Sequence, residues 1–94
     1  MSFKADIAIQ IDGNPGQLVD LSMTGAQVLT PAAINPNRLV TVTLPLSDSV
    51  LSCKAKVAWS RLEPRSGQLW YRAGVQFTTV DQQGLESFFG MYQT

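Results

Sequence analysis

The stretch LSCKAKVAW, residues Leu51–Trp59, is the segment that decides the fold of this sequence. Every second residue along it is apolar: Leu51, Cys53, Ala55, Val57 and Trp59. Side chains of a β-strand point alternately to its two faces, so a period of two predicts a strand with one face in a core. We therefore expect Trp59 to share the core with the other four residues of its phase.

The same period of two continues on both sides of this stretch. Before it, Ile7, Ile9 and Ile11 alternate with polar or small residues. Further short apolar runs predict strands at Gln17–Leu21, Ala26–Thr30, Leu39–Leu44 and Leu69–Thr78. Segments rich in Gly, Pro or polar residues separate the strands and predict turns and loops at Asp12–Gly16, Pro31–Asn37, Pro45–Ser49 and Arg61–Gln68.

The period changes near the C-terminus, where the spacing becomes helical. One apolar stripe is formed by Leu85, Phe88, Phe89 and Tyr92. Asp81 precedes the stripe as a suitable N-cap, and Val80 and Leu85 stand at the two positions of a hydrophobic staple. The sequence therefore predicts a short C-terminal helix.

Six consecutive antiparallel strands in so short a chain are expected to close into a barrel, because closure removes unpaired strand edges. The sequence thus predicts an all-β fold with one helix, a six-stranded antiparallel β-barrel followed by a C-terminal α-helix. We expect one domain over residues 1–94, which is either complete or a fragment of a longer protein.

The composition excludes several classes of function. Seven Lys and Arg residues balance seven Asp and Glu residues without charge blocks, whereas a non-specific nucleic-acid binder would present a basic face. No apolar run approaches the ~18 residues of a membrane span. We therefore expect neither a nucleic-acid polymer as a partner nor a membrane span.

Catalysis and metal binding are also disfavoured. The chain has no histidine, which removes Ser-His-Asp and Cys-His catalysis and every His-based metal site. Cys53 is the only cysteine, so no intrachain disulfide can form, and its phase places it in the core. We expect a protein that is not an enzyme, holds no metal or cofactor, and resides in a reducing compartment such as the cytoplasm.

One hexapeptide, DLSMTG at Asp20–Gly25, has two interpretations. Asp, Ser and Gly are typical turn residues, so the stretch can be a turn and nothing more. A carboxylate can also accept two parallel N–H bonds from the edge of guanine, a serine hydroxyl can add a third bond, and a glycine lets the backbone approach a flat ligand. The second interpretation makes Asp20, Ser22 and Gly25 a guanine-binding turn.

Three stretches, followed by an amphipathic helix, together resemble the PilZ domain family. They are DLSMTG, which matches Asp-x-Ser-x-x-Gly, AKVAW (Ala55–Trp59) and YRAGVQF (Tyr71–Phe77), and the resemblance runs from about residue 5 to 92. PilZ domains are six-stranded β-barrels with a C-terminal helix that serve as bacterial receptors for cyclic di-GMP. The resemblance implies that Asp20, Ser22 and Gly25 line the guanine-binding side.

The sequence departs from the family pattern at its beginning. PilZ receptors carry an Arg-x-x-x-Arg motif upstream of the first strand, but the only cation upstream of Asp20 is Lys4. A lysine cannot make the bidentate contacts of an arginine. One Arg-x-x-x-Arg occurs at Arg61 and Arg65, in the expected loop, and we keep both as weaker candidates for ligand contact together with Lys4 and Arg72.

Two functions follow from these observations. The first is a PilZ-type regulatory module of cyclic di-GMP signalling, in which the Asp-x-Ser-x-x-Gly turn binds the nucleotide. Because this chain lacks the upstream Arg-x-x-x-Arg motif, we expect its binding to be weak or absent. The second is a degenerate PilZ domain that acts as a protein–protein adaptor without nucleotide. For the adaptor, Trp70 alternates with Arg72 on the face opposite the core, which makes it either an ordinary surface residue or part of a partner-binding patch.

Overall fold

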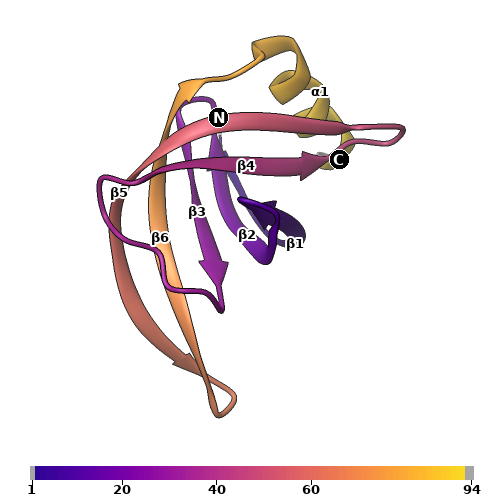
Figure 1. Ribbon diagram of the computed structural model, residues 1–94. Helices are drawn as coiled ribbons and strands as arrows, with labels where there is room; N and C mark the ends of the chain where they lie inside the picture. Colours follow the sequence, from indigo (N-terminus) through magenta and orange to yellow (C-terminus); the bar gives the residue numbers. More distant parts are fainter. Residues whose placement is uncertain (1, 93–94) are drawn as a thin grey trace.

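The computed structural model describes the backbone of residues 2–92 and the side chains of residues 7–91. Its six strands are β1 (Ser2–Ile11), β2 (Asn14–Ser22), β3 (Gly25–Thr30), β4 (Leu39–Pro45), β5 (Val50–Arg65) and β6 (Gln68–Thr79), and they precede one helix, α1 (Gln82–Tyr92). The strands form a closed barrel in the order β1-β2-β3-β6-β5-β4, and every pair is antiparallel (Figure 1). The predicted fold class is confirmed.

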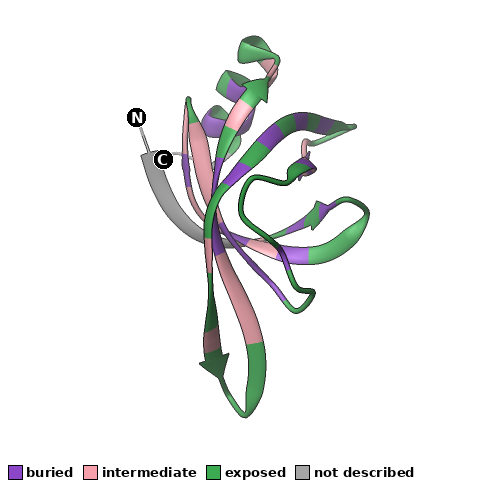
Figure 2. Cartoon of the chain, turned by 60° about the vertical axis from the view of Figure 1, so that its left-hand side comes forward, coloured by how far each residue is buried: buried purple, intermediate pink, exposed green. Residues whose placement is uncertain are grey.

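The core fills the barrel with aliphatic and aromatic side chains from all six strands and the helix. On the first half of β5, Leu51, Cys53, Ala55 and Val57 are buried while the residues between them are exposed, as the alternation predicted. Burying a side chain of the size of Leu51 or Val57 stabilises the fold by roughly 1.5–3 kcal/mol. Buried residues concentrate in the barrel and on the inner side of α1 (Figure 2).

Helix α1 lies at one end of the barrel (Figure 1). Asp81 caps it: its carboxylate accepts a hydrogen bond from the Gln83 amide at 3.1 Å, and its carbonyl oxygen accepts one from the Leu85 amide at 2.9 Å. The stripe residues Leu85, Phe88 and Phe89 are buried in the core cluster, which confirms the predicted packing. The side chain of Tyr92, also predicted in this stripe, lies outside the described residues.

Trp59 is placed differently from the prediction, because β5 contains a bulge. Val57 pairs with Val75, but Trp59 pairs with Gly74, so Ala58 is an extra residue on β5. A bulge changes the phase of alternation. Trp59 therefore faces outward with 38% of its surface exposed, and its predicted place in the core is wrong.

The predicted polar loop at Arg61–Gln68 is also wrong, since β5 and β6 continue through it. Only Ser66 and Gly67 form the turn, both with positive φ (51° and 78°). Two such residues make the tight connection that suits a twisted antiparallel hairpin. The hairpin projects beyond the barrel because its neighbour β3 ends at Thr30, opposite Tyr71 (Figure 1).

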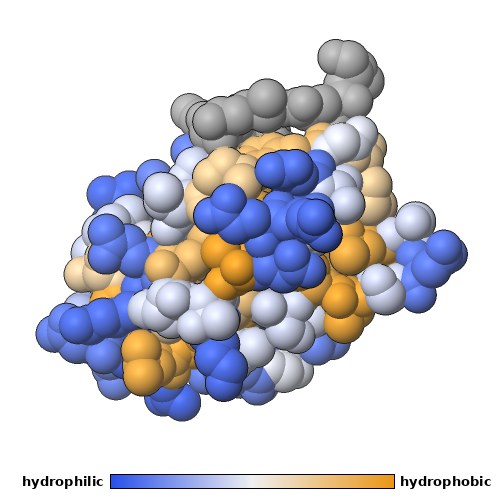
Figure 3. Space-filling view, turned by 90° about the horizontal axis from the view of Figure 1, so that it is seen from above, coloured by the Kyte–Doolittle hydropathy of each residue, from blue (hydrophilic) through white to orange (hydrophobic). Residues whose placement is uncertain are grey.

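The surface carries scattered large apolar residues. Those most exposed are Leu39, Val50, Trp59, Leu62, Leu69 and Met91. Seen from the end that carries α1, hydrophobic residues lie between hydrophilic ones (Figure 3). Among residues 2–92, the one helix is too short to span a membrane.

Candidate functional site

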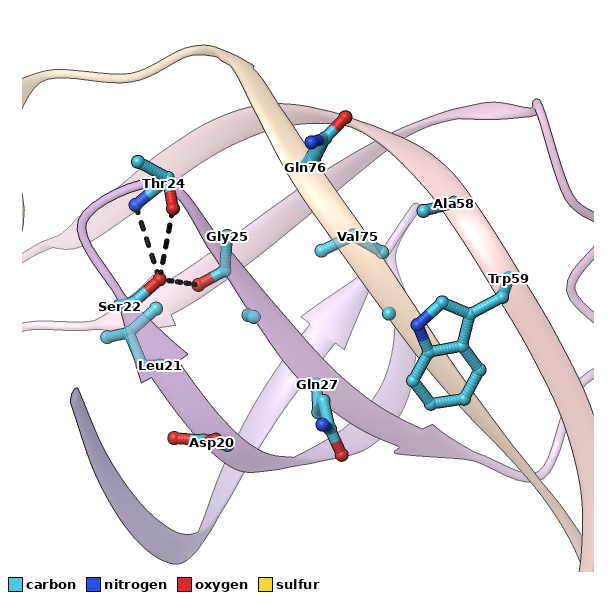
Figure 4. A pocket seen from close by; sticks show the side chains of 12 residues that line it. Asp20, Leu21, Ser22, Thr24, Gly25, Gln27, Ala58, Trp59, Val75 and Gln76 are labelled. Atoms are coloured by element: carbon cyan, nitrogen blue, oxygen red, sulfur yellow. Dashed lines mark hydrogen bonds between the residues drawn. The ribbon is translucent and has the colours of Figure 1, made fainter.

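The DLSMTG stretch forms the end of β2, a tight connection and the start of β3. The Ser22 hydroxyl closes this connection: it accepts a bond from the Thr24 amide at 3.3 Å and donates one to the Gly25 carbonyl oxygen at 3.3 Å (Figure 4). The Ser22 hydroxyl also lies within hydrogen-bonding distance of the Thr24 hydroxyl, at 3.3 Å. Ser22 therefore has a clear structural role in the turn, as the simpler interpretation of the hexapeptide predicted.

Gly25 is needed where the hairpin meets β6. A Cβ atom at Gly25 would lie 2.3 Å from the carbonyl oxygen of Val75. The adjacent Thr24 carbonyl oxygen accepts a hydrogen bond from the Phe77 amide at 2.9 Å, which holds the two backbones together. The glycine is explained by this close approach of two strands, and it also lines the cleft described below.

Asp20 is positioned by a second bulge, which lies in β2 between Leu18 and Asp20. Beyond it Asp20 pairs with Gln27 of β3. The Oδ1 atom of Asp20 is buried and has no hydrogen-bond partner among the described residues. A buried oxygen left without a donor is costly, so the Asp20 carboxylate, which lines the cleft described below, retains the capacity to accept an N–H group.

Asp20 belongs to a row of residues that crosses four strands on the outer face of the barrel. Asp20 pairs with Gln27, Gln27 with Gly74, and Gly74 with Trp59. Directly paired residues of antiparallel strands share a face. The row lines an open cleft of about 360 Å³, whose other walls include the Ser22–Ala26 turn (Figure 4).

Trp59 forms the far wall of this cleft. Its indole ring lies across β6 at Gly74, where an added Cβ would come within 2.3 Å of the indole Nε1 (Figure 4). Gly74 thus lets the aromatic ring rest on the backbone of β6. The cleft combines a carboxylate at one end with an aromatic ring at the other, which suits a flat ligand with N–H donors.

Two arginines lie beside the cleft, two residue pairs further along the β5–β6 hairpin than Trp59 and Gly74. The Arg61 guanidinium carbon is 5.5 Å from the centre of the Trp59 ring. Arg72 stands directly opposite Arg61 on β6 and donates two hydrogen bonds to the Glu63 carboxylate, at 2.7 and 2.9 Å. These bonds hold the pKa of Glu63 below its usual value and raise the pKa of Arg72.

Comparison with known proteins identifies the family. The model of the PilZ domain matches residues 1–90. The chain belongs to the PilZ family. No curated protein matches it, and no solved structure does either. A PilZ domain is a regulatory module of the cyclic di-GMP-binding type, not an enzyme, and the six-stranded barrel agrees with that assignment.

The structure brings some of the predicted site residues of this PilZ domain together. Asp20, Ser22 and Gly25 all line the cleft, and Arg61 touches its Trp59 wall. Arg65 lies at the hairpin end, in a separate hollow of about 270 Å³ that it shares with Trp70. The Cα of Lys4 pairs with Asp20, but the Lys4 side chain lies outside the described residues.

Gln27, Gly74 and the outward position of Trp59 were not predicted from the sequence. Gly74 stands in the stretch YRAGVQF, inside the predicted sixth strand. A glycine inside an otherwise regular strand often marks a bulge or a close approach. Gly74 is such a glycine, and it is the feature of the sequence that could have predicted an aromatic ring packed on β6.

In the part of the chain that the structure describes, no three His, Cys, Asp or Glu residues gather to form a metal site. Cys53 is buried in the core, as predicted. Burial raises the pKa of its thiol to about 11, and Asp81 adds to that shift. The charged thiolate is therefore disfavoured at neutral pH, and a nucleophilic role for this cysteine is not supported.

Proposed function

We propose that this PilZ domain is a regulatory module that binds cyclic di-GMP in the outer-face cleft, with one guanine between Asp20 and Trp59. The observation that carries the proposal is that Asp20, whose buried Oδ1 has no hydrogen-bond partner among the described residues, lines the same cleft as an exposed aromatic ring. Guanine presents two adjacent N–H donors to a carboxylate and a flat face to an indole. No other nucleobase offers that pair of donors on one edge.

In this proposal Arg61 contacts a phosphate of the ligand. Its guanidinium is exposed at the rim of the cleft and is held near Trp59. A charged hydrogen bond contributes roughly 1.5–3 kcal/mol. Lys4 is the one further cation that the backbone pairing brings to Asp20, and a single lysine does not replace two arginines. We therefore expect weak binding from this chain.

The test is calorimetric titration of cyclic di-GMP into the chain and into Asp20→Ala. Loss of a carboxylate that accepts two bonds is expected to weaken binding by at least about tenfold. Asp48→Ala, which removes an exposed carboxylate from the turn between β4 and β5, is the matched control and is expected to leave the affinity unchanged. Equal affinities for the chain and Asp20→Ala, or no binding at all, would overturn the proposal.

The protein-binding adaptor is favoured by a separate observation. Leu62 and Leu69 lie on one face of the projecting hairpin, paired with Tyr71 and Pro64, and are 56% and 62% exposed. Large apolar side chains exposed together on a projecting element are typical of an interaction surface. As an adaptor, the domain would bind a partner equally well with and without nucleotide, and Leu62→Ser would abolish that binding.

We also propose that the module works in the cytoplasm. Its one cysteine is a buried free thiol in the core, not half of a disulfide. Such a thiol is ordinary in a reducing compartment. The direct check is fractionation of cells that express the full-length protein.

A further inference from the structure

Arg72 occupies a central place on the outer face. Its guanidinium reaches the Glu63 carboxylate on β5 through Nε and Nη2, and the Gln27 side-chain oxygen on β3 through Nη1 at 3.4 Å. Both partners are diagonal neighbours of Arg72 in the sheet. The Arg72 side chain is only 19% exposed, so it is far more fixed than a surface arginine.

The bonds to Glu63 use one complete edge of the guanidinium. Nε and Nη2 form the fork that binds a carboxylate or a phosphate with two parallel hydrogen bonds. In this chain the fork is occupied by the chain's own carboxylate, at 2.7 and 2.9 Å. A ligand phosphate could use the same edge only by displacing Glu63.

We infer that Glu63 is an internal competitor of the ligand phosphate for Arg72, and so sets the affinity of the nucleotide site. Arg72 adjoins that site, because Nη1 is bonded to Gln27, which lines the cleft. Arg61, which lies over the Trp59 wall, is directly opposite Arg72. Opposed arginines repel one another, and an anion between them would relieve that repulsion.

This inference rests on the proposed function for the identity of the ligand, but its anion site can be tested alone. The chain and Glu63→Gln are titrated calorimetrically with pyrophosphate and with cyclic di-GMP. Glu63→Gln keeps the size of the side chain and removes its charge. Glu86→Gln makes the same change at an exposed position on α1 and serves as the matched control.

We expect Glu63→Gln to bind both ligands about tenfold more tightly, because the charged group that competes for the Nε and Nη2 atoms of Arg72 has been removed. Glu86→Gln is expected to stay within about twofold of the parent chain, because a remote exposed charge is screened. The gain must vanish when Glu63→Gln is combined with Arg72→Gln. That double variant separates release of Arg72 from a general change in charge.

Three results would overturn the inference: equal pyrophosphate affinity of the chain and Glu63→Gln, no pyrophosphate binding by Glu63→Gln, or a gain that persists without Arg72. The proposed function fails separately. If Glu63→Gln binds pyrophosphate more tightly but no chain binds cyclic di-GMP, the competitor role stands and the nucleotide proposal falls. If Asp20→Ala no longer binds cyclic di-GMP while Glu63→Gln has the same affinities as the parent chain, the nucleotide proposal stands and the competitor role falls.

Discussion

Two hairpins build the cleft, and they differ in what holds them. The β2–β3 hairpin is fixed by its own residues, because the Ser22 hydroxyl bonds both Thr24 and Gly25 within the turn. The β5–β6 hairpin is instead fixed by contacts between its two strands. These are the bulge at Ala58 of β5 and the Trp59 indole that rests on Gly74 of β6. The first supplies the carboxylate of the site, and the second supplies its aromatic wall and its arginines.

The difference shows which features depend on local chemistry and which depend on pairing. A turn closed by bonds between residues two or three apart is encoded in a few letters. A bulge depends on the register of two paired strands, here at residues well removed from the Ser66–Gly67 turn that joins them, and it reverses the facing of every residue that follows. Substitutions and a pH change in the two hairpins test this contrast.

Gly25→Ala is expected to cause a larger loss of stability than Gly74→Ala or Leu69→Ala, because the new Cβ would lie 2.3 Å from a backbone oxygen of Val75 that cannot move alone. We expect a loss of about 2–3 kcal/mol in the free energy of unfolding, measured by urea denaturation. Gly90→Ala, where nothing lies within 4 Å, is the control and should raise stability by about 0.5–1 kcal/mol. Similar losses at the two sites would show that strand contact does not explain Gly25.

Cys53 tests the regular half of β5, before the bulge. Burial raises the pKa of its thiol from 9.0 to about 11. The unfolded chain therefore gains a thiolate above pH 9 while the folded chain does not, so stability falls as the pH rises from 9 toward 11. Urea denaturation at pH 8 and 10.5 should show a loss of roughly 1–2 kcal/mol that Cys53→Ala lacks. The same loss in Cys53→Ala would assign it to other groups.

Gly74→Ala tests the second hairpin and contrasts directly with Gly25→Ala. The new Cβ would again come within 2.3 Å of a neighbour, but that neighbour is the Trp59 ring, which can rotate away. We expect a loss of only about 1 kcal/mol, since the ring is already partly exposed. The NMR signal of the Trp59 indole N–H should shift clearly. A loss as large as that of Gly25→Ala, with the indole signal unchanged, would show that the ring is not free to move.

Leu69→Ala should have the smallest effect. Leu69 is 62% exposed on the projecting hairpin, outside the core cluster. Its truncation is expected to change the free energy of unfolding by less than about 0.5 kcal/mol. Leu18→Ala, at a fully buried position, should cost about 2–5 kcal/mol by the same measurement. A comparable cost at Leu69 would mean that the hairpin end packs against the barrel.

Most of the fold could be predicted from the sequence because its signals are local. The alternation of β5 as far as Val57, the cap at Asp81 and the helical stripe of α1 each lie within a few residues. The prediction failed beyond Val57, where the bulge reversed the phase. It also failed at Arg61–Gln68, because polar residues there form strands that face solvent on both sides.

The candidate site was only half predictable for the same reason. Asp20 and Ser22 share one hexapeptide, so their proximity is written in the sequence. Trp59 and Arg61 reach the cleft only through the pairing of β5, β6 and β3, and no spacing in the sequence reveals that alignment. The opposition of Arg61 and Arg72, and the bonds of Glu63, are consequences of the same register.

The joint contribution of both hairpins to one nucleotide site is the core of the proposed function. It is tested most directly by NMR titration of the ¹⁵N-labelled chain with cyclic di-GMP, following the Asp20 amide, the Trp59 indole N–H and the Glu86 amide on α1. We expect the Asp20 and Trp59 signals to shift together with one dissociation constant while the Glu86 signal stays in place. Shifts confined to one hairpin, or no shift at either, would contradict it.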